Sequence, residues 1–69
     1  MTDKHILFNG DVLSVPPDCT VQHLLQTLQL LGKRLAVEIN GQIVPRSQFS
    51  ELRLQNDDRV EIVQAIGGG

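Results

Sequence analysis

The sequence predicts an α+β fold in which one helix covers one face of a mixed sheet of four to five strands. Two Asn-Gly pairs, each flanked by alternating apolar residues, predict two β-hairpins. Between the hairpins, apolar residues at the spacing i, i+3, i+4, i+7 predict an amphipathic helix. A last alternating segment predicts a further strand, so the expected order is hairpin, helix, hairpin, short turn, strand.

The first hairpin is expected around Asn9-Gly10, because a type I′ turn needs positive φ at both central residues. A two-residue loop pairs Ile6 with Leu13, and cross-strand partners share one face of the sheet. Leu7 then points to the opposite face. The core-facing set is Ile6, Phe8, Leu13 and Val15.

The helix is expected to begin after Thr20, which is a favourable N-cap residue. Its apolar stripe consists of Val21, Leu24, Leu25 and Leu28, and Leu31 extends it. Gly32 would supply the left-handed residue that commonly follows a helix. Lys33 and Arg34 would then lie near the negative end of the helix dipole.

The later strands follow the same alternation. Residues 35–39 and 42–44 form the second hairpin around Asn40-Gly41, and Pro45 ends it. Residues 59–65 form the last strand, in which Val60 and Ile62 share one face. The other face of that strand carries Glu61, Val63 and Ala65.

Composition excludes several classes of protein. The chain has 69 residues, a formal charge of −2 and 3% aromatic residues, which argues against a nucleic-acid partner. One cysteine cannot form an internal disulfide, and this favours a reducing compartment. No segment resembles a signal peptide or approaches the ~20 apolar residues of a membrane span. We therefore expect a complete cytoplasmic protein with no membrane association.

Cys19 and His23 are the only residues that suggest catalysis. A thiol just before a helix with a histidine nearby is the minimal nucleophile and base. Against this, Asp18 opposes thiolate formation beside it, and His23 lies off the apolar stripe. With His5 added, the three residues still lack the paired spacing of a zinc site. We expect no catalytic side chain and no metal.

The C-terminal glycines carry more information. Gly67, Gly68 and Gly69 follow a predicted strand, and no helix follows them to make a phosphate loop. A frayed terminus is one interpretation. The other is a tail for a narrow channel, because glycine has no Cβ, and residues 66–69 would reach roughly 13 Å beyond the strand. This predicts a domain over residues 1–66 and a flexible tail over residues 67–69.

From Ile6 to Gly69 the chain resembles the ThiS family, the ubiquitin-like β-grasp sulfur carriers of thiamine biosynthesis. The matching segments are ILFNG at 6–10, TV and LL at 20–21 and 24–25, EINGQIVPR at 38–46, and RVEIV at 59–63 before Gly68-Gly69. Two features depart from the family pattern: Asn56-Asp57-Asp58 stands where glycine is frequent, and Gly67 is an extra glycine. The resemblance implies that the first and last strands are central and parallel.

The resemblance also implies a reaction sequence and its partners. An E1-like adenylyltransferase of the ThiF type would use ATP to adenylate the Gly69 carboxylate. Sulfur from a cysteine desulfurase relay would replace the adenylate, and the Gly69 thiocarboxylate would give its sulfur to thiazole synthase of the ThiG type. The chain would bind no cofactor itself and would act as a co-substrate rather than an enzyme.

A docking patch follows from the strand register within that fold. Leu7, Val63 and Ala65 would point away from the helix and form an exposed apolar surface near the tail. Arg46 is a candidate charge at its rim. We expect partners to dock there.

Two related functions stay open at this point. The small subunit of molybdopterin synthase shares the fold and the thiocarboxylate, although short length and 3% aromatic residues count against it. A ubiquitin-like modifier joined to lysines through Gly69 would be activated in the same way. The sequence alone does not distinguish sulfur transfer from conjugation.

Overall fold

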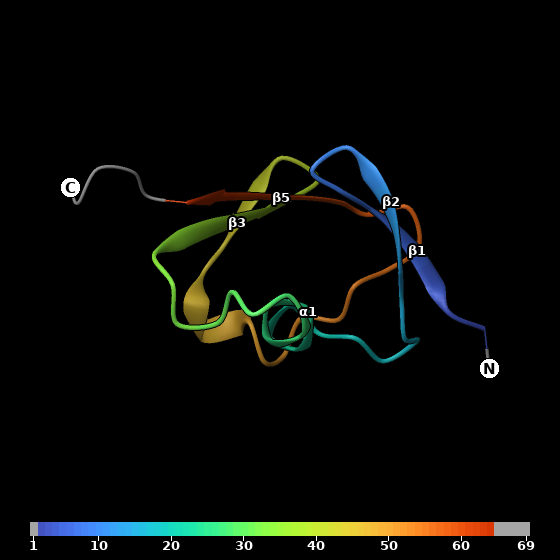
Figure 1. Cartoon of the computed structure of the whole chain (residues 1–69), viewed down its shortest axis with the longest axis horizontal. Helices are drawn as coiled ribbons and strands as arrows, with labels where there is room; N and C mark the ends of the chain where they lie inside the picture. The colour runs from blue at the N-terminus through green and yellow to red at the C-terminus, as the bar shows by residue number, and fades with distance from the viewer. Residues whose placement is uncertain (1, 65–69) are drawn as a thin grey trace.

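A five-stranded mixed sheet carries one helix across one face in the computed structural model of the chain, which describes residues 2–64 (Figure 1). The strand order is β2-β1-β5-β3-β4. The elements are β1 (Lys4–Phe8), β2 (Asp11–Val15), α1 (Val21–Thr27), β3 (Leu35–Ile39), β4 (Gln42–Val44), the short 3₁₀ helix η1 (Arg46–Gln48) and β5 (Arg59–Gln64). β1 and β5 are parallel neighbours inside the sheet, and the other pairs are antiparallel. The predicted fold class is confirmed.

Both Asn-Gly turns have the backbone that the sequence predicts. The φ angles are 48° and 91° at Asn9 and Gly10, and 52° and 84° at Asn40 and Gly41. Positive φ at both central residues is the type I′ condition. The resulting register pairs Ile6 with Leu13, so the prediction for the first hairpin is confirmed.

The core lies between α1 and the sheet. Val21, Leu24 and Leu25 of the helix are buried, as are residues of all five strands and of the connecting segments. Each fully buried aliphatic side chain contributes about 1.5–3 kcal/mol of transfer free energy. The remaining buried apolar residues are Ile6, Val15, Cys19, Val37, Val44, Phe49, Leu54 and Val60.

The start of α1 is capped as predicted. Thr20 is extended, and its Oγ1 accepts a hydrogen bond from the backbone N of His23 at 3.1 Å. This bond satisfies one of the backbone N–H groups that have no partner in the first turn of a helix.

The end of α1 differs from the prediction. The helix stops at Thr27, and Gln29 takes the left-handed conformation with φ 59°. The N–H of Leu30 then donates to the carbonyl of Leu25 at 2.7 Å, and that of Gln29 donates to Gln26 at 3.1 Å. This pair of bonds is the Schellman motif, in which an apolar residue after the left-handed position packs back on the helix. Leu30 meets that condition, because it is packed against the core.

Two expectations for the following loop are therefore wrong. Leu31 is not part of the helix stripe and is 46% exposed, because Leu30 takes the core position. Lys33 and Arg34 lie beyond the last turn, which contains no basic residue, so they do not complement the helix dipole.

Within residues 2–64, no helix has the length and apolar character needed to cross a membrane.

Candidate functional site

The candidate site is the end of β5, from which the predicted glycine tail leaves the sheet. Gln64 is the last residue of that strand and of the described chain. Four residues that the sequence singled out, Ala65, Gly67, Gly68 and Gly69, lie outside the described residues. The structure therefore bears on the base of the tail, and this base is built by the two strands and the turns that flank β5.

The turn between β1 and β2 holds β5 from one side. The backbone N–H of Asn9 donates to the carbonyl of Val60 at 2.9 Å. Its side-chain Oδ1 accepts from the backbone N of Ile62 at 3.0 Å. Only two β1 residues pair with β5, Leu7 with Arg59 and Phe8 with Val60. Asn9 therefore provides a hydrogen-bond partner for β5 at Ile62, beyond the point where its pairing with β1 ends.

The second turn holds β5 from the other side. The backbone N–H of Asn40 donates to the carbonyl of Arg59 at 2.8 Å, and its Oδ1 accepts from the N–H of Arg59 at 3.0 Å. Its Nδ2 donates to Asp58 Oδ1 at 3.0 Å. Sequence reasoning assigned both asparagines only to their turns and missed these contacts. Together they fix the strand that carries the tail.

Two of the predicted docking residues, Leu7 and Val63, are exposed on one face of the sheet but are not neighbours. Leu7 is 36% exposed and Val63 is 56% exposed. Leu7 pairs with Arg59, four residues before Val63, which places Val63 about 13 Å further along the strand direction. Leu7 lines a hollow with Arg59 and Glu61, whereas Val63 does not line that hollow.

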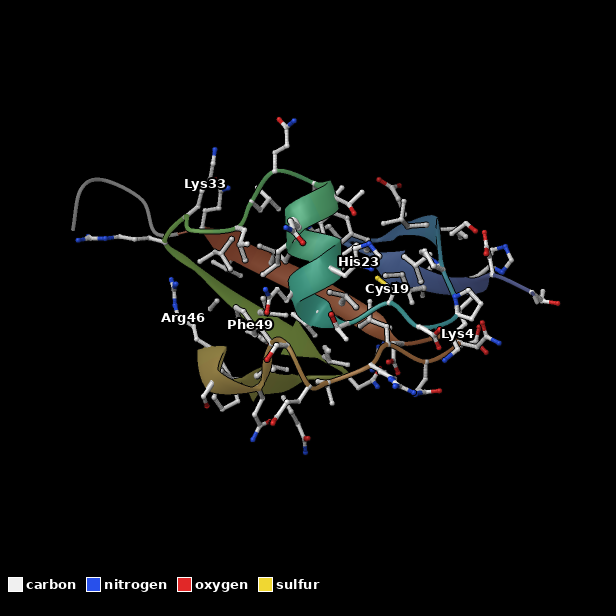
Figure 2. The ribbon with its side chains drawn as sticks, turned by 90° about the horizontal axis from the view of Figure 1, so that it is seen from below. Lys4, Cys19, His23, Lys33, Arg46 and Phe49 are labelled. Atoms are coloured by element: carbon white, nitrogen blue, oxygen red, sulfur yellow. The ribbon has the colours of Figure 1, made fainter. Side chains whose placement is uncertain are left out.

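Val63 does lie close to Arg46. Both line an open hollow of about 390 Å³ at the end of β5, together with Gln64. Its other lining residues are Arg34, Leu35 and Ala36. The guanidinium of Arg46 donates to the carbonyl of Lys33 at 3.2 Å, which joins η1 to the loop before β3. Figure 2 shows Lys33 and Arg46 at the same end of the molecule, with Lys4 at the other.

Cys19 and His23 do not form a nucleophile and base. Cys19 is 2% exposed, and its thiol donates to the carbonyl of Thr20 with a distance of 3.4 Å from sulfur to oxygen. Burial raises the pKa of this thiol above its ordinary value, which disfavours the reactive thiolate. His23 is exposed on the surface of α1. Within residues 2–64, no three His, Cys, Asp or Glu side chains gather as a metal site would require.

Comparison with known proteins identifies a family for this architecture. Residues 6–69 match the ThiS family. The sulfur carrier protein ThiS of Escherichia coli strain K12 is 38% identical over 64 residues, which is 93% of this chain and 97% of that protein. The crystal structure of thiamine biosynthesis protein ThiS from Geobacter metallireducens superposes with a TM-score of 0.80 at 28% identity, covering 94% of this chain and 99% of that one.

A second kind of relative is much longer. A thiazole synthase of Paramagnetospirillum magneticum is 36% identical over 64 residues. The match covers 93% of this chain but 20% of that protein. The chain thus spans about a fifth of the length of this synthase and almost all of the E. coli carrier.

Proposed function

The chain belongs to the ThiS family, and we propose that it is a sulfur carrier of thiamine biosynthesis that works through the carboxylate of Gly69. The observation that carries this proposal is the extent of the family match, which runs from residue 6 through the last glycine, Gly69. The anchoring of β5 supports it, because Asn9 holds the strand at Ile62, two residues before its end, and Asn40 holds its first residue, Arg59. A firmly held strand limits where the tail can point.

The chemistry explains why such a carrier needs activation. An α-carboxylate has a reference pKa near ~3.5, so at neutral pH it is ionised and is a poor electrophile. Attack of one carboxylate oxygen on the α-phosphorus of ATP releases diphosphate and forms an acyl adenylate. A sulfur nucleophile at the oxidation level of hydrosulfide then attacks the acyl carbon, AMP leaves, and a thiocarboxylate remains.

The carrier contributes position rather than a catalytic group. Its reacting atom is the main-chain carboxyl carbon of Gly69, so we propose that the chain is a co-substrate and not an enzyme. The tethered sulfur reaches its acceptor at a high effective concentration. Glycines 67–69 suit passage through a narrow channel because they have no Cβ.

We propose three partners for this cycle. An E1-like adenylyltransferase uses ATP to activate Gly69, a cysteine desulfurase relay supplies sulfur, and thiazole synthase receives it. The P. magneticum thiazole synthase supports the last assignment, because about a fifth of that protein is similar to this chain. In that protein a carrier-like segment and the synthase share one polypeptide.

We also propose that partners dock on the outer face of the sheet near the tail. Val63, Ala65 and Arg46 would form this surface, with Leu7 as an outlying contact. Val63 supports the proposal because it is 56% exposed and lies beside Arg46 in the hollow at the end of β5. An exposed apolar side chain beside a charge is a common composition at protein interfaces.

The terminus provides the decisive experiment. The chain is incubated with activating enzyme, ATP and a sulfur donor, and thiocarboxylate is measured by intact-protein mass spectrometry. Removing Gly69 moves the carboxylate back by about 3.3 Å, and ~1 Å of misplacement can cost a hundredfold in rate. Adding one residue after Gly69 replaces the carboxylate with an amide. Gly68→Val adds a branched side chain where the channel would admit only backbone.

We expect all three changes to abolish or strongly reduce thiocarboxylate formation without lowering the melting temperature. Thr2→Val, an exposed substitution far from the tail in sequence, is the control and keeps the wild-type yield. Wild-type yield from the Gly69-deleted or extended chain would refute the carrier mechanism. Adducts linked to lysine in place of thiocarboxylate would indicate conjugation instead.

A further inference from the structure

Basic residues gather at the end of the molecule from which the tail leaves. Three of the six Lys and Arg residues of the chain are there: Lys33 and Arg34 before β3, and Arg46 in η1. Lys33 and Arg46 line one hollow, and Arg34 and Arg46 line the next one along the surface, where Gln64 ends β5. All three are exposed. Figure 2 shows two of them, Lys33 and Arg46, at this end of the ribbon.

Acidic residues lie at the opposite end of β5. Asp57 and Asp58 immediately precede this strand. Asp3 precedes β1, which runs parallel to β5 and therefore begins at the same end. The closest acidic positions to the tail along the strands are Glu38 and Glu61, which pair with each other two positions back from the Ala36–Val63 pair. Lys4 and Arg59 also lie at that end, as the first residues of β1 and β5, so its charge is mixed, whereas the end beside Gln64 carries the basic cluster.

Part of this basic cluster lies outside the regular elements, in the loop before β3. Lys33 and Arg34 lie beyond the last turn of α1, so the helix dipole does not account for them. The contact from Arg46 to the carbonyl of Lys33 fixes the guanidinium beside the hollow. The walls of the hollow include Leu35 and Val63. A patch of charge around a partly apolar floor is suited to recognising a protein surface.

We propose that Lys33, Arg34 and Arg46 form a basic collar that docks on an acidic surface at the mouth of the activating enzyme's tail channel. The inference rests on the proposed function and adds the chemistry of the partner. Five residues follow Gln64 and span at most about 18 Å when fully extended. With Gly69 at the reaction centre, the collar would lie within that distance of it, at the outer end of the channel.

The negative charge of ATP is our reason for choosing the activating enzyme as the occupant of this surface. That enzyme holds ATP, whose phosphates repel the ionised Gly69 carboxylate as it approaches. Cations at the base of the tail offset this repulsion and turn the basic end of the carrier toward the site. Such steering raises association rates by about 10- to 1000-fold and weakens as salt increases.

The test compares two variants with the same net charge. Arg34→Gln combined with Arg46→Gln removes two positive charges from the collar. Arg53→Glu changes the charge by the same amount at an exposed position that lines neither collar hollow. Association with the activating enzyme and ATP is followed by stopped flow at ~0.01 M and ~1 M salt, where the Debye length is about 30 Å and 3 Å.

At low salt we expect the collar variant to associate about tenfold more slowly than wild type, and Arg53→Glu to stay within about twofold. At high salt the three proteins converge. Melting curves confirm that each variant is folded.

Equal rates for the collar variant and Arg53→Glu at low salt would overturn the collar alone. If the collar variant still associates more slowly than wild type by the same factor at high salt, the collar is also refuted, because the slower association would then not be electrostatic. The same measurement with thiazole synthase forms a second arm, and a deficit found only there would overturn the choice of partner. Failure of wild type to bind the activating enzyme would overturn both the collar and the proposed function.

Discussion

Asn9 Oδ1 accepts a hydrogen bond from the backbone N of Ile62 at 3.0 Å, although 53 residues separate them in the sequence. Asn40 makes the equivalent contact with Arg59 from the other side of β5. Each asparagine therefore has two roles. Its backbone adopts the positive φ of the turn, and its side-chain oxygen accepts a hydrogen bond from the backbone of β5. The strand that carries the tail is fixed by the two hairpin turns as well as by its neighbours.

This relationship predicts different outcomes for two substitutions at one position. Asn9→Gly keeps the positive φ but removes the acceptor, and we expect it to lower the free energy of unfolding by about 1 kcal/mol. Asn9→Asp keeps both an acceptor oxygen and tolerance of positive φ, so its stability should stay within about 0.5 kcal/mol of wild type. Urea denaturation measures both, and hydrogen exchange at the Ile62 amide should accelerate only in the glycine variant. Equal exchange in the two variants would contradict the contact.

The end of α1 can be tested with two leucines six residues apart. Leu25 is 1% exposed and Leu31 is 46% exposed. Leu25→Ala should cost about 2–5 kcal/mol, a large share of the stability of a small domain. Leu31→Ala should change stability by no more than about 0.5 kcal/mol. Thermal or urea unfolding measures both, and a large loss in Leu31→Ala would restore the longer helix that its sequence period suggested.

Gln29 offers a stabilising substitution, because its φ of 59° suits glycine better than a residue with a Cβ. We expect Gln29→Gly to raise the free energy of unfolding by about 0.5–1 kcal/mol. Gln26→Gly is the matched control, since it places the same change inside the helix. There glycine should cost about 1 kcal/mol. Destabilisation of similar size at both positions would be inconsistent with the Schellman ending.

Buried Cys19 predicts a pH dependence of stability. Burial raises its pKa in the folded state, so the native protein keeps the thiol proton at a pH where the unfolded chain has lost it. The unfolded state then binds fewer protons, and stability falls as pH rises above the unfolded value of about 8.5 toward the folded pKa. Cys19→Ala has no thiol to ionise at this position, so its free energy of unfolding should decline less over the same alkaline range. Parallel declines in urea titrations of the two proteins would argue against the shift.

Val63 tests the outer face of the sheet. Val63→Asp should weaken binding to the activating enzyme or to thiazole synthase while the protein stays folded, because a carboxylate replaces an exposed apolar contact beside the tail. Val12→Asp, 69% exposed on β2, makes the same change away from β5. It should leave both affinities near wild type. Titration calorimetry gives the affinities, and equal binding by the two variants would remove Val63 from the interface.

The sequence predicted those features that depend on nearby residues. The Asn-Gly turns, the Thr20 cap and the alternation of the strands are signals within a few positions, and the structure confirms them. The prediction for the end of α1 was wrong because Leu31 and Gly32 also fit the sequence pattern of a helix end. The helix ends earlier because Leu30 packs on the core, which the local sequence does not show. Likewise, Arg34 and Arg46 are twelve residues apart in sequence. Only the folded chain places both beside Gln64.

The parallel pairing of β1 with β5 has a consequence for biosynthesis. The first strand cannot complete its hydrogen bonding until residues 59–64 have been made, so the sheet closes late during synthesis of the domain. Contacts of such long sequence separation also slow folding, because a large loop must be ordered first. An unfinished chain leaves β1 with an open edge and offers no fixed base for a tail. The strand that leads into the tail is therefore the last element that the sheet needs in order to close.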